Sequence, residues 1–329
     1  MIGRKKELRQ IAGRIITGQS TIITDSPRSG KTSVLEYLMA PEKQAELYDD
    51  EAKQLIFSYW DACTCTPELT LAQFWQRVLK PLKEYIEAEQ SNSQLAKAYH
   101  NCKENHFDNY ELEKLIAEIK KIDKRLVLII DEMDALSDST FSLHSAEFFG
   151  GLRLLVSRSR GALVLVITAN ISRSQLNEKT RNRKTGSLYF NHLEEVVLGA
   201  LSDTEINELL AQKETSFSEN DCDFLKEIAG GHPYLLKVAA SVLWKSYEEG
   251  EEKESLRRQQ QVKQDFYLKV IDTLNAIWAL WDEKMRDTFI SITLAQFEHL
   301  KMMISPKSLN KIIQDTSRYK AHELAELEK

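Results

Sequence analysis

Proline and glycine are scarce in this sequence, and it contains no long apolar run. Six prolines and 12 glycines among 329 residues argue against long disordered linkers. No apolar run reaches the ~18 residues that a membrane span requires. Segment 1–14 is charged and lacks the apolar core of a signal peptide. These absences predict a cytoplasmic protein without a membrane segment.

Cysteine is also rare, with only Cys63, Cys65, Cys102 and Cys222. The first two are close in sequence, but one C-x-C pair without a second is a poor zinc signal. We therefore expect four reduced thiols, as in a cytosolic protein.

Positive charge is outnumbered: 44 Lys and Arg stand against 50 Asp and Glu, for a net charge of -6 and a pI of about 5.8. The net charge and the pI do not indicate a large basic surface for binding nucleic acid, although a local basic face is compatible with these totals. The length allows two or three domains with cores of their own.

Apolar runs alternate with helical patterns up to about residue 200. Runs rich in Val, Ile and Leu predict strands at 21–24, 55–60, 126–130, 163–167 and 195–198. Apolar residues spaced three and four apart predict helices at 5–17, 33–39, 71–82, 110–121 and 145–158. Fully apolar strands alternating with helices predict an α/β fold with a parallel sheet covered by helices. The polar segment 83–108 has no clear period and is predicted as a partly helical insertion.

The strand pattern ends near residue 200, and helical patterns continue to the C-terminus. Ser202 and Glu205 form an S-x-x-E capping box in front of a predicted helix. Segment 246–264 is charged and rich in Gln, which predicts a domain boundary or a long solvated helix.

Residues 25–32 read D-S-P-R-S-G-K-T and lie between a predicted strand and a predicted helix. They match G-x-x-x-x-G-K-[ST] at every fixed position but the first. Such a loop turns its backbone N–H groups around phosphates, and the positive N-terminal end of the next helix adds to the attraction. Lys31 is expected to reach the β- and γ-phosphate oxygens and Thr32 to bind Mg²⁺, while Gly30 allows close backbone approach. The predicted nucleotide-binding residues of this segment are Ser26, Pro27, Arg28, Ser29, Gly30, Lys31, Thr32 and Ser33.

Asp25 occupies the first glycine position of the motif. Glycine adopts a positive φ there without cost. Aspartate tolerates the left-handed region better than most residues, but it places a negative charge near a polyphosphate. This substitution leaves open a nucleotide-binding scaffold with negligible hydrolysis.

A second motif is the apolar run 126–130, which ends in Asp131 and Glu132. A buried parallel strand delivers the residues that follow it to the carboxyl edge of the sheet, where ligands bind. Asp131 is predicted to hold the Mg²⁺ shell together with Thr32. Glu132 is placed to polarise the attacking water.

The strand at 163–167 is followed by Thr168 and Asn170. A polar residue at this strand end can touch the γ-phosphate or its water, and Asn170 is the first candidate, with Thr168 second. Lys31, Glu132 and Asn170 are therefore the predicted catalytic residues. Three arginines are candidates for sensing the γ-phosphate, although each can equally be a solvated loop residue: Arg173, Arg181 and Arg183.

The run A-G-G-H-P-Y-L-L at 229–236 joins two predicted helices. The two glycines end one helix, and Pro233 begins the next at a position that proline favours. The local pattern alone predicts a tight helical turn.

Over about residues 1–245 these motifs resemble, in order, those of STAND and AAA+ P-loop ATPases. M-I-G-R-K-K-E-L at 1–8 is similar to the hhGRxxEL motif with which that family begins, and the loop at 25–32 to its G-P-R-R-x-G-K-T-S form. S-L-Y-F-N at 187–191, then V-V-L-G-A-L-S at 196–202 and Glu205, resembles the S-P-F-F-N … L-G-P-L-S-x-x-E stretch of bacterial STAND-like ATP-binding proteins. Segment 229–236 is similar to the G-x-P motif of NB-ARC and archaeal ATPase relatives.

The resemblance implies ATP or ADP with Mg²⁺ as the bound group. It places Ile2 and Gly3 against adenine and Pro233, on a helical lid, on the other side of the base or ribose. His232 lies next to that contact and is not expected to bind phosphate. The implied domains are a P-loop ATPase domain at 1–199, a helical lid at 200–247 and a winged-helix-like domain at 262–329.

The function expected from the resemblance is a slow or partner-stimulated ATPase that acts as a conformational or assembly switch. It would form a homo-oligomer, regulate a separate effector protein, or both. By analogy with the family, such a protein would belong to a bacterial antiviral-defence or stress module. A DNA-associated ATPase, such as an origin-recognition or transposition loader, is the alternative. It is less favoured, because the basic residues of the C-terminal third are mixed with acids.

Overall fold

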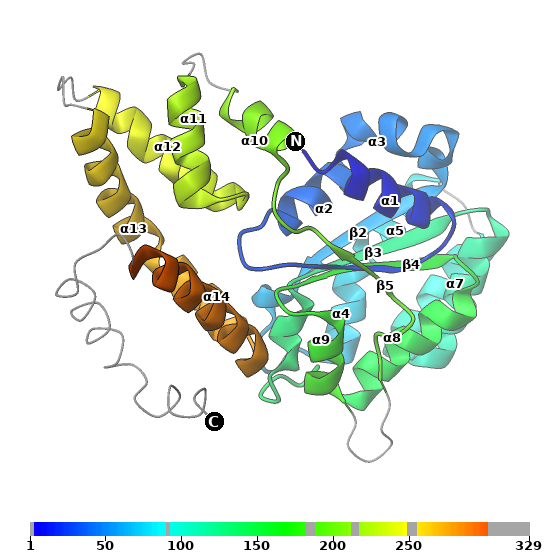
Figure 1. The fold of residues 1–329 in the computed structure, drawn as a ribbon. Helices are drawn as coiled ribbons and strands as arrows, with labels where there is room; N and C mark the ends of the chain where they lie inside the picture. The colour runs from blue at the N-terminus through cyan, green and yellow to red at the C-terminus, as the bar shows by residue number, and fades with distance from the viewer. Residues whose placement is uncertain (1–2, 90–92, 182–187, 212–216, 249–254, 302–329) are drawn as a thin grey trace. The chain divides into compact units, whose positions relative to one another are not determined.

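The computed structural model describes residues 3–89, 93–181, 188–211, 217–248 and 255–301 (Figure 1). The chain divides into two compact units, Met1–Thr273 and Leu274–Lys329. Ile2 and Arg183, two of the predicted functional residues, lie outside the described residues.

A five-stranded parallel sheet forms the centre of the first unit, in the order β2-β3-β4-β1-β5. The strands are β1 Thr21–Thr24, β2 Leu55–Asp61, β3 Arg125–Asp131, β4 Leu163–Ala169 and β5 Glu194–Val197. This arrangement confirms the predicted α/β fold. Because β4 lies between β1 and β3, the carboxyl ends of these three strands meet at one edge of the sheet.

Helices of the first unit cover both faces of this sheet (Figure 1). The helices of this unit that precede α13 are α1 Lys5–Ile16, α2 Lys31–Met39, α3 Pro41–Tyr48, α4 Leu71–Val78, α5 Lys80–Ala88, α6 Gln94–Glu104, α7 Asn109–Lys121, α8 Ala146–Ser159, α9 Arg173–Thr180, α10 Asp203–Leu210, α11 Glu219–Ala229 and α12 Pro233–Glu248, of which the last three do not cover the sheet (Figure 1). Short 3₁₀ turns are η1 Asp49–Gln54, η2 Ala62–Thr64 and η3 Met133–Ser137.

The two faces of the sheet are packed differently. On one face, buried aliphatic side chains of α1 and α2 form a cluster with Val127 and Ile129 of β3. Side chains alternate along a strand, so the intervening residues of β3 face the other layer. That layer is aromatic: Phe74 of α4 makes edge contacts with both Trp60 and Phe148, at 5.0 Å between ring centroids. Burial on both faces explains why β3 is apolar at every position over 126–130 and β4 over 163–167.

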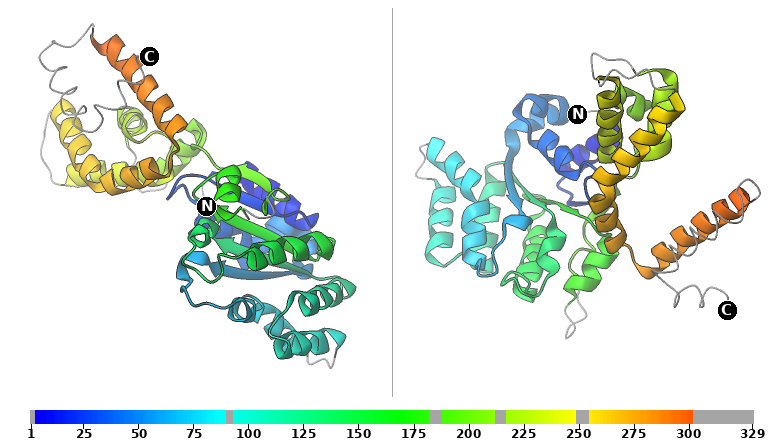
Figure 2. Two further views of the ribbon diagram at one scale, coloured as in Figure 1. Left: turned by 90° about the horizontal axis from the view of Figure 1, so that it is seen from below. Right: turned by 90° about the vertical axis from the view of Figure 1, so that its left-hand side faces the viewer.

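The segment from 71 to 108 contains the helices α4, α5 and α6, and the insertion at 83–108 is partly helical, as predicted. The single helix expected over 71–82 is two helices, α4 and α5, which meet at Leu79 just before Pro81. The insertion contains α6, whose buried residues Leu95, Ala98 and Cys102 are spaced three and four apart among polar residues. In Figure 2 the helices α5, α6 and α7 group together, coloured cyan to teal.

The helical region after β5 begins at the predicted capping box. The Ser202 hydroxyl accepts from the Glu205 backbone N–H, and the Glu205 carboxylate accepts in return from the Ser202 N–H at 2.9 Å. Helices α10, α11 and α12 follow within the first unit.

The second unit contains the end of α13 (Ser255–Leu280) and α14 (Glu283–Lys301). Trp278, Trp281 and Phe289 contact one another there, with ring centroids 5.2–6.0 Å apart. Residues 302–329 of the predicted winged-helix-like domain lie outside the described residues. Across the part of the chain that the structure describes, no helix combines the length and the apolarity needed to cross a membrane.

Candidate functional site

The loop at 25–32 leaves β1 at the carboxyl edge of the sheet and leads into the first turn of α2. Gly30 has a φ of 97°, a left-handed conformation that favours glycine, and Arg28 takes up a φ of 63°. The first N–H groups of a helix have no partner within it. The start of α2 therefore presents free donors next to this loop, which can bind an anion.

Asp25 fits the loop without the special backbone that glycine supplies, because it is not among the residues with positive φ. Its N–H donates to the Ala169 carbonyl at 3.3 Å, so it continues the pairing of β1 with β4. Its carboxylate accepts from the Ser26 N–H at 2.6 Å. The missing glycine therefore costs no backbone strain here, although the carboxylate occupies one loop N–H and keeps a negative charge nearby.

Lys31 is buried, and its ammonium group reaches across the loop. It donates to the carbonyl oxygens of Asp25 at 2.9 Å and Ser26 at 2.8 Å, and to Asn170 Oδ1 at 2.9 Å. Burial lowers the pKa of this ammonium, while the negative charge of Asp25 opposes the shift. The lysine thus joins the loop to the end of β4.

Thr32 and Asp131, the two residues predicted to hold Mg²⁺, lie side by side. The Thr32 hydroxyl donates to Asp131 Oδ2 at 2.7 Å. The other oxygen of Asp131 accepts from the Thr168 hydroxyl. Tyr59 of β2 donates to Oδ2 at 3.2 Å. The carboxylate is therefore oriented by side chains from two neighbouring strands.

Glu132 adopts a left-handed conformation, with φ 52° and ψ 46°. Its N–H donates to Thr168 Oγ1 at 2.8 Å. Its carboxylate accepts from the Cys63 thiol, with Sγ and Oε2 2.7 Å apart. Burial raises the pKa of Cys63 to about 12, with the Glu132 hydrogen bond and charge adding to the shift.

The environment of Cys63 predicts a measurable reactivity. The Glu132→Gln substitution removes a charge that disfavours the thiolate, so the pKa of Cys63 should fall and its alkylation at pH 8 should accelerate several-fold. The rate is measured by mass spectrometry of the Cys63 peptide after iodoacetamide treatment. Cys222, whose pKa is raised mainly by burial, serves as the internal control. An unchanged Cys63 rate would contradict this contact.

Asn170 lies at the end of β4, and the order of the strands puts it between the two motifs. Besides accepting from Lys31, it donates its backbone N–H to Asp134 at 3.1 Å and its side-chain amide to the same carboxylate at 3.3 Å. Its amide is thus held with Oδ1 toward Lys31. The hydroxyl of Thr168, the second candidate, instead donates to Asp131 and accepts from the Glu132 N–H.

Two of the three arginines proposed as γ-phosphate sensors, Arg173 and Arg181, are engaged elsewhere. The Arg173 guanidinium donates to the Leu193 carbonyl at 2.6 Å. The Arg181 guanidinium, just after α9, lies 3.8 Å from the carboxylate of Glu178 in the last turn of that helix. Neither side chain contacts the loop at 25–32 in this structure.

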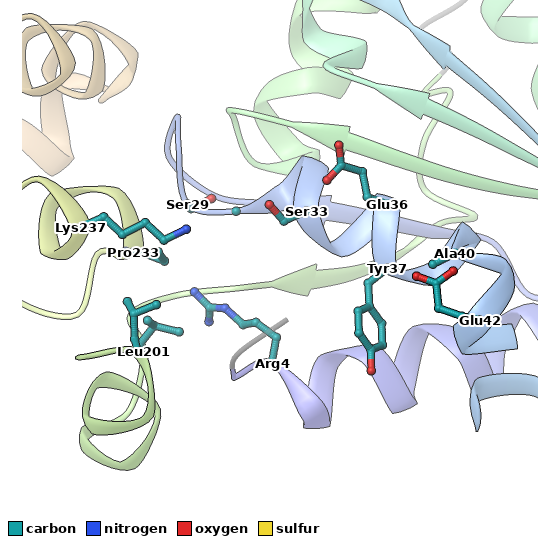
Figure 3. Close-up of a pocket in the computed structure, with 12 residues that line it drawn as sticks. Arg4, Ser29, Ser33, Glu36, Tyr37, Ala40, Glu42, Leu201, Pro233 and Lys237 are labelled. Atoms are coloured by element: carbon teal, nitrogen blue, oxygen red, sulfur yellow. The ribbon is translucent and has the colours of Figure 1, made fainter. Parts of the chain in front are cut away.

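A cavity of about 490 Å³ adjoins the start of α2 (Figure 3). Ser29, Gly30 and Ser33 line it on one side, and Pro233 and Lys237 of α12 on another. Its remaining walls include Leu201 and Arg4, but Gly3 is not among the lining residues. Figure 3 shows the Lys237 side chain extending from α12 toward Ser29. Sequence reasoning missed Lys237, although its position four residues after Pro233 puts both on one face of a helix.

The N-terminal Gly3-Arg4 pair joins the start of the chain to the segment after β5. Gly3 has a φ of 71°, a left-handed conformation that favours glycine, and a Cβ there would lie 2.9 Å from Glu205 Oε1, so the carboxylate would have to move. The buried Arg4 guanidinium donates to the carbonyls of Leu198 and Gly199, the second at 2.7 Å. Arg4 also donates its N–H to Glu205 at 2.6 Å. The pair therefore fixes one wall of the cavity, a role that the local pattern did not reveal.

The residues of this site fit a magnesium-bound nucleoside triphosphate. The hydroxyl of Ser29 is buried without a hydrogen-bond partner, and the adjacent helix start supplies free N–H groups. Thr32 and Asp131 offer the hard oxygen ligands that Mg²⁺ prefers. This constellation, on a sheet of order β2-β3-β4-β1-β5, defines a P-loop ATPase.

Comparison with known proteins gives the family directly. Residues 2–285 match the AAA-like domain family, and the chain belongs to it. No curated protein sequence matches the chain.

Two solved structures, with TM-scores above 0.5, show the same fold. A Walker-type ATPase of Pyrococcus abyssi is similar at 14% identity over 84% of this chain and 76% of that one, with a TM-score of 0.52. The ORC2 protein of Aeropyrum pernix, solved as ADPNP-ADP complexes, gives 15% identity over 80% and 67% with a TM-score of 0.53. A STAND protein with a tetratricopeptide-repeat sensor from Pyrococcus horikoshii gives 19% identity, 80% and 32% coverage and a TM-score of 0.43.

Proposed function

We propose that this protein binds ATP with Mg²⁺ at the cavity beside α2 and hydrolyses it slowly, or faster when a partner is present. The observation that carries the proposal is the meeting of two motifs at one sheet edge. Lys31 reaches Asn170, and Thr32 reaches Asp131, although each pair is about a hundred or more residues apart in sequence. A chance G-K-T sequence would not bring both partners into place.

Each residue has a role that follows from its position. The N–H groups at the start of α2 and the Lys31 ammonium bind the phosphate oxygens. Thr32 and Asp131 are the groups that would hold Mg²⁺, which neutralises charge on the phosphates. Glu132 accepts a proton from the attacking water, and Asn170 orients that water or the γ-phosphate.

The lid carries the switch in this proposal. Pro233 and Lys237 line the cavity from α12, so a bound nucleotide would contact the domain at 1–199 and the lid at 200–247 together. A ligand that favours one arrangement of two parts shifts their equilibrium toward it. We infer that ADP favours a closed arrangement, that ATP favours an open or assembled one, and that the domain at 262–329 transmits the change.

The partner is a second copy of this chain, a separate effector protein, or both. The test is the particle mass of the protein, measured by light scattering in the presence of ADP and of ATP. The Glu132→Gln variant is used because it should bind ATP without hydrolysing it. A larger particle, or capture of a partner in ATP alone, supports the switch. Equal mass and equal partner binding in both nucleotides would overturn it. ATP binding without phosphate release even beside a partner would point to the scaffold alternative.

A further inference from the structure

Both ring nitrogens of His232 make hydrogen bonds, one within the lid and one to the loop at 25–32, which we call the phosphate loop. Its Nδ1 accepts from the Leu235 N–H in the first turn of α12, a long bond of 3.5 Å. Its Nε2 lies 3.2 Å from the Pro27 carbonyl oxygen, 205 residues away in sequence. A carbonyl oxygen only accepts hydrogen bonds, so Nε2 carries the proton and Nδ1 is free to accept.

We propose that His232 is a positioning residue for nucleotide binding: its Nε2–H holds the Pro27 carbonyl and keeps the phosphate loop in the shape that binds anions. This inference rests on the proposed function, since it assigns a task at the same site. It differs from a phosphate contact because His232 acts through the loop.

The carbonyl groups of the loop show why such a residue is useful. A loop that binds phosphate must direct its N–H groups inward and its carbonyl oxygens elsewhere, because a carbonyl oxygen repels an anion. The ammonium of Lys31 engages the carbonyls of Asp25 and Ser26. His232 engages the next carbonyl, that of Pro27. Three successive carbonyls are thus held, two from within the loop and one from the lid.

A second contact joins the same two segments. The Arg28 guanidinium lies over the Tyr234 ring, 4.3 Å from the centroid. Neighbouring loop residues are therefore paired with residues on either side of Pro233. The lid contacts the loop directly, in addition to facing it across the cavity.

The imidazole is kept in the neutral form that this arrangement needs. Burial lowers the pKa of His232, and the positive charges of Lys31 and Arg4 lower it further. The Pro27 carbonyl and the Asp25 carboxylate act in the opposite direction. Neutral imidazole both donates and accepts, whereas the protonated ring would lose its bond from Leu235.

Two substitutions test the contributions of the two ring nitrogens separately. In His232→Gln the amide can reach Pro27 as Nε2 does, but the cap on α12 is lost. In His232→Asn the shorter side chain caps α12 well but does not reach Pro27. We measure Mg-ATP affinity by calorimetry and thermal stability in the full chain, next to unmodified protein.

We expect one variant to lose affinity for Mg-ATP and the other to lose thermal stability. His232→Asn should unfold near the temperature of the parent, because its better cap on α12 offsets the lost bond to Pro27. It should bind Mg-ATP about three- to tenfold more weakly, the value of one net hydrogen bond. His232→Gln should lose about 2–4 °C of thermal stability and keep its affinity within twofold. Parental affinity in His232→Asn, or affinities that follow stability, would overturn the inference. Absence of binding in the parent protein would instead remove the proposed function.

Discussion

Replacement of Lys31 by alanine should weaken Mg-ATP binding about a hundredfold or more. The lysine is the buried cation closest to the start of α2, and its ammonium already donates to two loop carbonyls and to Asn170. Removing a charged donor to a phosphate costs about 1.5–3 kcal/mol, and here the loop also loses the group that holds two of its carbonyls. Titration calorimetry with Mg-ATP measures the loss.

Two controls make this result specific. Lys120→Ala removes an exposed lysine on α7, far in sequence from the loop, and should leave affinity unchanged. Circular dichroism and thermal unfolding of Lys31→Ala show whether the fold survives. A folded Lys31→Ala protein that binds Mg-ATP as tightly as its parent would refute the placement of the phosphates at this loop.

Replacement of Glu132 by glutamine should separate binding from turnover. Removal of a general base lowers the rate of the chemical step about 10²–10⁴-fold. Glutamine keeps the shape of the side chain, and Asp131 and Thr32 stay in place, so Mg-ATP affinity should change less than about threefold. Phosphate release in single-turnover conditions gives the rate, and calorimetry gives the affinity.

The matched control is Glu147→Gln, which neutralises an exposed carboxylate at the start of α8. It should retain the parental turnover. Equal rates in Glu132→Gln and its parent would assign the base to another group. Measurable binding with no turnover in the parent, alone or with a partner, would instead favour a scaffold, for which Asp25 beside the phosphates supplies a physical reason.

The contact between Cys63 and Glu132 bears on the same experiment. In this structure the carboxylate of the expected base accepts from a thiol that follows β2. β2 lies on the side of β3 away from β1 and the phosphate loop. Two measurements on the same Glu132→Gln protein therefore test one carboxylate. Alkylation of Cys63 tests its contact with the thiol, and phosphate release tests its role as the base.

Much of the architecture followed from local pattern. The strands at 126–130 and 163–167 were evident because a strand buried on both faces must be apolar at every position. The motif at 25–32 was recognisable because phosphate binding needs a particular loop in front of a helix, and that at 131–132 because it follows an apolar strand. The insertion at 83–108 was harder, because the apolar residues of α6 are few and are buried by neighbouring helices.

The sequence by itself determined the class of fold, the two phosphate-site motifs and the helical region that follows the sheet, because each of these is encoded in residues close together in the chain. The tertiary structure alone decided the rest. It placed β4 between β1 and β3, which brings Asn170 to Lys31, and it brought Lys237 to the cavity and His232 to Pro27. These contacts join segments up to about 200 residues apart, and no local periodicity specifies which distant carbonyl a side chain will meet. The same holds for Asp25, whose acceptable backbone conformation depends on its pairing with Ala169.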